Sequence, residues 1–131
     1  MVDTLAATLI ITVAMAGSVG IFFNVLSLTQ RTVEASLTSS LARKAIEDSK
    51  IYGFDGLSDG TSVKYYNNNG TALSNSTGAA FKVTTTVSTD LFDSDGTPSD
   101  NALRTVLVTV QRSSDNSTLE TTGTYLAKGG S

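Results

Sequence analysis

The fold of this chain follows from residues 4–30, which read TLAATLIITVAMAGSVGIFFNVLSLTQ and contain no Asp, Glu, Lys or Arg. A helix needs about 20 consecutive apolar residues to cross a bilayer, and this run is longer. A cleaved secretory signal has a basic start and an apolar stretch of only about 7 to 15 residues. No Lys or Arg precedes Thr4. We therefore expect residues 1–28 to form an apolar helix for a membrane or for the centre of an assembly.

After this run the chain changes from uniformly apolar to amphipathic. Val33, Leu37, Leu41 and Ala45 recur every four residues. This spacing places side chains on one face of a helix. Residues 29–52 are therefore predicted to be an amphipathic continuation of the apolar helix, with one face that needs a partner.

The two segments are expected to form a single helix. Proline is absent from residues 1–52, so nothing in this stretch removes a backbone hydrogen bond from a helix. The pattern predicts a helix from about Asp3 to about Lys50. Gly53 and Gly56 are its expected stop signals.

Residues 53–131 are expected to form a globular head that is rich in β-strands. Apolar and polar residues alternate from Phe81 to Val87, as in a strand with one buried face. The centre of residues 102–111 is apolar on both sides, which suits an internal strand. Short polar connections favour an antiparallel sheet. The four expected strands cover residues 62–66, 81–87, 102–111 and 118–125.

The fold class predicted from these elements is α+β. The buried face of the sheet needs an apolar cover, and the amphipathic half of the helix is the only other apolar stripe in the chain. The C-terminal half of the helix should therefore pack on a roughly four-stranded antiparallel sheet, through Val33, Leu37, Leu41 and Ala45. The first 25 or so residues are then left without a partner in the same chain, and need lipid or other copies.

Composition argues against nucleic-acid binding and against most enzymes. The formal charge of −3 and the pI near 4.7 do not suit a protein that neutralises phosphates. The chain has no Cys and no His, which removes thiolate nucleophiles and the side chain best suited to proton transfer near neutral pH. We expect no catalytic residue and no cofactor.

One acidic loop is a candidate for calcium. Asp93, Asp95 and Asp100 have carboxylates that are able to supply oxygen ligands. The spacing is not that of an EF-hand, and the closing Glu is absent. The sequence therefore favours a solvated loop over a calcium site.

The order of these features resembles the type IV pilin and pseudopilin family. The match rests on MVDTLAATLI at residues 1–10, an apolar start with one acid, and on LARKAIE at residues 41–47 followed by IYGF at residues 51–54. The resemblance implies a structural filament subunit. Its implied partners are copies of itself, inner-membrane lipid before assembly, and a pilus or secretion assembly machinery. Its implied location is the inner membrane, and then a cell-surface or periplasmic filament.

The resemblance and the apolar pattern together assign ten residues to assembly. The chain has Asp3 where the family usually has Glu at the fifth position, and Gly20 falls where the family has a proline. A major pilin, a minor pilin and a secretion pseudopilin remain open. The alternative is a single-span anchored module whose head binds a partner. The assembly residues are Met1, Asp3, Leu5, Leu9, Ile10, Val13, Gly17, Gly20, Phe22 and Phe23.

Two local expectations accompany this interpretation. Asp3 is the only charged side chain before Arg31. It either pairs with the N-terminal amine of an adjacent copy or caps its own helix. Gly17 and Gly20 each cost about 1 kcal/mol relative to Ala in a helix, so the helix is expected to loosen or bend between them.

Overall fold

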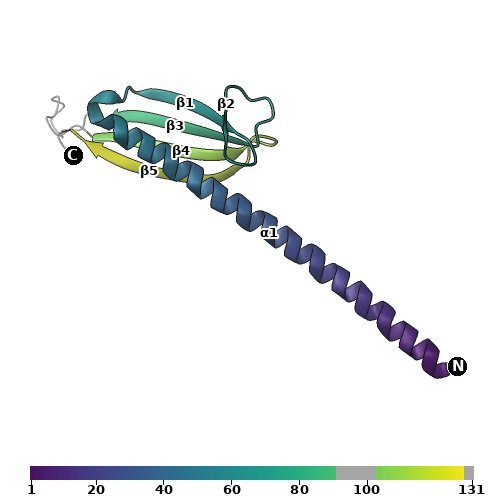
Figure 1. Ribbon diagram of the computed structural model, residues 1–131. Coiled ribbons are helices and arrows are strands. Elements are labelled where there is room, and N and C mark those ends of the chain that lie inside the picture. The colour runs from purple at the N-terminus through teal and green to yellow at the C-terminus, as the bar shows by residue number, and fades with distance from the viewer. Residues whose placement is uncertain (91–102, 129–131) are drawn as a thin grey trace. The chain divides into compact units, whose positions relative to one another are not determined.

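The computed structural model describes residues 1–90 and 103–128, and it confirms the α+β fold. One helix is followed by strands of an antiparallel sheet (Figure 1). The chain consists of two compact units, Met1–Ser36 and Leu37–Ser131. The elements are α1 Val2–Gly56, β1 Gly60–Tyr66, β2 Ala72–Leu73, β3 Phe81–Asp90, β4 Leu103–Arg112 and β5 Thr118–Ala127.

Helix α1 is longer and more regular than the sequence predicts. The expectation of a bend between Gly17 and Gly20 is wrong, because Gly53 is the one residue of α1 with non-helical backbone angles. Glycine lowers helix propensity but keeps its backbone NH, so the hydrogen-bond ladder is not broken. At Gly53 the φ angle is 66°, which glycine adopts without a steric cost. The predicted stop is therefore a kink, after which the helix continues to Gly56.

The five strands lie in the order β2-β1-β3-β4-β5, and every neighbouring pair is antiparallel. The predicted four strands are present, and β2 is an addition. It consists of two residues that pair with Tyr65 and Tyr66 at the end of β1. A turn joins β1 to β2, in which Asn67 Oδ1 accepts hydrogen bonds from the backbone NH groups of Asn69 and Thr71.

The core lies between the Leu37–Gly56 part of α1 and the inner face of the sheet. Leu41 and Ala42 are buried there with three valines of β4, and Leu37 and Ala45 pack against them. The predicted packing of Leu37, Leu41 and Ala45 is thus confirmed. The prediction for Val33 is wrong, because Val33 belongs to the N-terminal unit and is 60% exposed. The buried valines of β4 are Val106, Val108 and Val110.

The outer face of the sheet is rich in threonine, and no element of the described part of the chain packs on it. Strand β4 is internal, as its sequence predicts, with β3 on one side and β5 on the other. Only one of its faces is buried, however, since Leu107 is 44% exposed. The apolar centre of β4 therefore reflects its internal position in the sheet and not burial of both of its faces. Threonine is favoured on an exposed strand face, and Thr84 and Thr109 pair across β3 and β4 beside Leu107.

Arg104 connects the end of α1 to the sheet. Its guanidinium lies 4.5 Å from the ring centroid of Phe54 and donates to the Phe54 carbonyl oxygen. Its Nε also donates to Thr89 Oγ1 at 3.1 Å, and that hydroxyl donates to Asp59. This arrangement holds the segment after the Gly53 kink against the ends of β3 and β4.

A tight turn joins β4 to β5. The side-chain hydroxyl and the backbone NH of Ser117 both donate to Asp115, and they lower the pKa of that carboxyl below its usual value. Asn116 takes the positive φ angle of 55° that this turn needs, which asparagine tolerates well. The turn sets the pairing of β4 with β5, in which a register shift occurs between Val110 and Gln111.

Substitution of Leu41 by Ala should destabilise the head by about 2–5 kcal/mol, because a buried leucine leaves a cavity in the core. The matched control is Val33→Ala on the same helix, which should change stability by less than about 0.5 kcal/mol because Val33 is exposed. Urea unfolding of the full chain in mild detergent, followed by tyrosine fluorescence, measures both. Equal effects of the two substitutions would contradict the packing described above.

Candidate functional site

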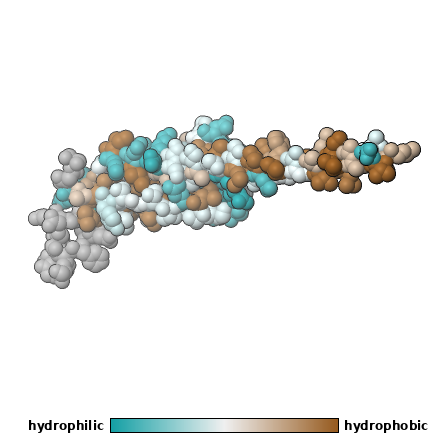
Figure 2. All heavy atoms as spheres, turned by 90° about the horizontal axis from the view of Figure 1, so that it is seen from below, coloured by the Kyte–Doolittle hydropathy of each residue, from teal (hydrophilic) through white to brown (hydrophobic). Residues whose placement is uncertain are grey.

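The N-terminal part of α1 has an apolar surface that none of residues 1–90 and 103–128 covers. Its most apolar window of 18 residues has a mean hydropathy of 2.2, and none of that window is buried. Apolar side chains account for much of the visible surface of this part of the helix (Figure 2). By length and composition, α1 is capable of crossing a membrane.

Most of the residues assigned to assembly share one side of this helix. Each residue of a helix advances by about 100°, so side chains 3, 4 and 7 positions apart fall close together. Six of the ten assembly residues fall within a sector of about 120° around the helix axis. Ile10 and Asp3 lie at one border of this sector, and Phe22 lies outside it. Met1 precedes the helix and is fully exposed. The sector contains Leu5, Leu9, Val13, Gly17, Gly20 and Phe23.

The two glycines of the sector leave room on the helix surface. A Cβ atom added at Gly17 or Gly20 would have no neighbour within 4 Å apart from the helix backbone itself. The described residues therefore give no reason within the chain for glycine at either position. Small residues of this kind allow the backbones of two helices to approach closely.

Six hydroxyl groups of residues 4–32 donate to backbone carbonyl oxygens three or four residues earlier, a feature that was not among the sequence-based expectations. Thr8 Oγ1 donates to the carbonyl oxygen of Thr4 at 2.7 Å, and Thr12 Oγ1 donates to that of Thr8 at 2.8 Å. A polar group without a partner costs free energy in hydrocarbon, and these bonds remove that cost. The spacing of four residues between Thr4, Thr8 and Thr12 in the sequence indicates these hydrogen bonds. The other hydroxyls bonded in this way belong to Thr4, Ser18, Thr29 and Thr32.

Asp3 lies in the first turn of α1, as its second residue, and is exposed. The capping position before the helix is occupied by Met1, whose carbonyl oxygen accepts from the backbone NH of Leu5. Within the described part of the chain, no hydrogen bond or ion pair involves the Asp3 side chain. A carboxylate in the first turn still interacts favourably with the helix dipole. The structure thus places Asp3 in the first turn of α1 and not at the N-cap position.

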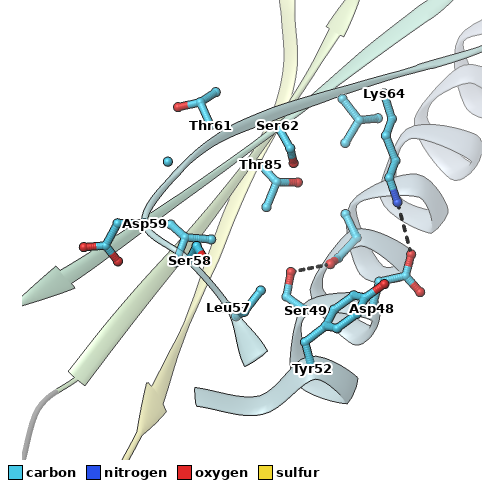
Figure 3. A pocket seen from close by; sticks show the side chains of 14 residues that line it. Asp48, Ser49, Tyr52, Leu57, Ser58, Asp59, Thr61, Ser62, Lys64 and Thr85 are labelled. Carbon is cyan, nitrogen blue, oxygen red and sulfur yellow. Dashed lines mark hydrogen bonds and ion pairs between the residues drawn. The ribbon is translucent and has the colours of Figure 1, made fainter. Parts of the chain in front are cut away.

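A groove of about 400 Å³ lies in the head between α1, β1 and β3 (Figure 3). Val83 and Val87 form an apolar floor, and Ala45 and Ser49 of α1 are too small to fill the space above it. Lys64 Nζ and Asp48 Oδ2 form an ion pair of 3.8 Å at the rim. Sequence reasoning missed this groove, because it depends on which residues of α1 face which strands.

The groove offers hydroxyl groups but few groups for catalysis. Ser62 and Thr85 face it from the sheet, and Tyr52 faces it from α1 (Figure 3). No group of three or more His, Cys, Asp or Glu side chains suited to a metal occurs in residues 1–90 and 103–128. The calcium candidates Asp93, Asp95 and Asp100 lie outside the described residues.

No family model, curated protein or solved structure matches this chain. The arrangement of a long apolar N-terminal helix and a small antiparallel sheet is compatible with a pilin-like architecture. The likeness to that family therefore rests on the architecture and on the residues quoted from the sequence.

A fragment that starts at Leu37 should fold alone and remain monomeric in water, since every member of the buried core lies beyond Ser36. The full chain should instead associate with lipid vesicles or detergent, because its N-terminal helix exposes a large apolar area. Circular dichroism and sedimentation velocity of both proteins measure this difference. An unfolded fragment, or a full chain that stays monomeric in plain buffer, would contradict this division of the chain.

Proposed function

We propose that this chain is a structural subunit of a type IV pilus-like filament, and that it assembles through its apolar N-terminal helix. The observation that carries the proposal is the exposed window of high hydropathy in α1. Burial of apolar surface contributes roughly 25 cal/mol per Å². Lipid of the inner membrane is the proposed cover before assembly, and copies of the same helix are the cover within the filament.

Two features of α1 favour copies of the helix as the final cover. Gly17 and Gly20 leave open space on a side that also carries leucine and phenylalanine. Helices associate in an apolar environment through such small residues. The hydroxyls bonded within the helix, such as that of Thr8, do not require water.

Asp3 is the proposed determinant of register. An isolated carboxylate in an apolar surrounding is expensive and is usually paired. Arg31 is the next charged side chain along the helix and lies about 40 Å away at 1.5 Å per residue. The N-terminal amine of an adjacent copy is therefore the cation proposed to pair with Asp3.

The proposed location follows from this assembly. The subunit is held in the inner membrane first and then enters a cell-surface or periplasmic filament with the help of a pilus or secretion machinery. The proposed function is structural and requires no catalysis or cofactor.

A single-span anchored module with a binding head is the alternative. It is favoured by one observation, the groove of about 400 Å³ beside Lys64 and Asp48, since this volume falls in the range of small-ligand pockets. The two functions differ in what the N-terminal helix contacts. Negative-stain electron microscopy of sheared surface material from cells that produce the chain, with antibody against the head, distinguishes them. Labelled filaments support the subunit, and their absence with the head still at the membrane supports the anchor.

Asp3→Asn should reduce the yield of filaments more than about tenfold, because loss of one partner of a desolvated ion pair costs about 3–5 kcal/mol. Insertion into the membrane should be unchanged, since the substitution leaves the apolar run of residues 4–30 intact. Quantitative immunoblotting of sheared filaments and of the membrane fraction gives both values.

The matched control is Thr8→Val, which keeps the shape of the side chain and removes a hydroxyl that bonds only within its own helix. This variant should assemble at the normal rate. Normal assembly of Asp3→Asn would leave Asp3 with only its interaction with the helix dipole.

A further inference from the structure

The groove between α1, β1 and β3 exists because small or polar residues occupy positions that face the core. Ala45 and Ser49 lie one turn apart on the side of α1 that lines the groove, and Ser49 is only 5% exposed. Strand β3 carries Thr85 between the buried Val83 and Val87, on the same inner face. Larger apolar side chains at these positions would extend the core and fill the space. The groove therefore follows from the choice of these residues.

Two hydroxyl groups face this groove side by side. Ser62 and Thr85 are register partners across β1 and β3, and both side chains line the groove (Figure 3). Among residues 1–90 and 103–128, neither of these hydroxyls forms a hydrogen bond with another residue. Side chains opposite each other on one sheet face have Cβ atoms about 4.5–5.5 Å apart, so one ligand is able to bond to both. Each hydroxyl donates and accepts, which suits a ligand that itself carries hydroxyl groups.

The groove adjoins one of two open edges of the sheet. Gly60–Lys64 of β1 pairs with β3 on one side, and no described residue pairs with its other side. The outer side of β5 is also unpaired within the described part of the chain, but β3 and β4 lie between it and β1. Backbone NH and carbonyl groups at an open edge are free to bond to a ligand. The β1 edge therefore adds donors and acceptors beside the groove.

Apolar surface lies next to these polar groups. Val83 and Val87 form the floor, and Tyr52, which is 66% exposed, supplies an aromatic ring from α1 (Figure 3). A sugar ring has hydroxyl groups around its edge and C–H groups on its faces. The C–H groups pack on apolar and aromatic side chains, and the hydroxyl groups bond to polar ones. The groove thus offers both kinds of contact that a sugar ring makes.

The charges of the groove favour a ligand without charge. Each charged side chain among the described lining residues already has a partner of opposite sign. Lys64 Nζ lies 3.8 Å from Asp48 Oδ2, and Arg104 Nε lies 4.0 Å from Asp59 Oδ1. An ionic ligand would meet no unpaired opposite charge here. A neutral ligand with hydroxyl groups is able to donate to the carboxylates and leave both ion pairs in place, and such bonds to charged acceptors are stronger than neutral ones.

We propose that this groove binds a neutral mono- or disaccharide. Ser62 and Thr85 bond to hydroxyl groups of the sugar, Tyr52 packs on a face of the ring, and Asp48 accepts a hydrogen bond at the rim. The volume of about 400 Å³ lies near the lower end of the range for small-ligand pockets, which is about 300–1,000 Å³. The groove lies wholly within the unit Leu37–Ser131, so binding does not depend on the proposed filament.

NMR titration of the full chain, in micelles of a detergent without sugar groups, tests this site. The neutral probes are lactose, maltose and diacetylchitobiose. At least one of them should give saturable shifts of backbone amide signals that are largest around Tyr52, Ser62 and Thr85. Sialyllactose, which adds a carboxylate to lactose, should cause smaller shifts than the best neutral probe at the same concentration, because Lys64 is already paired with Asp48.

Removal of single hydroxyl groups tests the contacts. Thr85→Val keeps the shape of the side chain and should weaken binding by about fivefold, as expected for the loss of one hydrogen bond. Ser62→Ala should weaken it to a similar extent, and its exposed position makes misfolding no explanation for the loss. The matched control is Thr84→Val, which removes a hydroxyl from the outer face of β3 and should bind as the unmodified chain does.

Three results would overturn the proposal. The first is the absence of saturable shifts with all three neutral probes. The second is stronger binding of sialyllactose than of any neutral probe. The third is unchanged binding in both Thr85→Val and Ser62→Ala, or an equal loss in Thr84→Val. A failure to find filaments by electron microscopy would leave these binding results as they are, so the saccharide site and the filament are tested separately.

Discussion

The structure depends on one constraint, which is that no described residue of the chain covers the apolar surface of residues 4–30. Such a surface is stable only in hydrocarbon or against other apolar helices. Three features of this helix suit an environment of hydrocarbon or of other apolar helices. Most of its hydroxyls bond to backbone carbonyl oxygens of the preceding turn, its charges are confined to its ends, and its glycines leave open space. Each feature adds little in water, and together they suit a helix away from water.

The same constraint explains why the head carries a complete core of its own. Leu41 and Ala42 close the inner face of the sheet, and nothing before Leu37 belongs to the buried cluster. The head is therefore able to keep its fold whether the N-terminal helix lies in lipid or among other copies. Arg104 adds to this independence, because it holds the last turn of α1 against β3 and β4. Changes of environment along α1 need not reach the sheet.

Local periodicity was sufficient to predict the helix, four strands and the helix face of Leu37, Leu41 and Ala45. It failed where distant residues decide the outcome. Val33 has the same spacing as Leu37, but it lies before the part of α1 that packs on the sheet. The two-residue β2 has no alternation to detect and exists because the turn after Tyr66 returns the chain to β1. The groove and the open edges depend on strand order and register. Local periodicity in the sequence does not predict either of these.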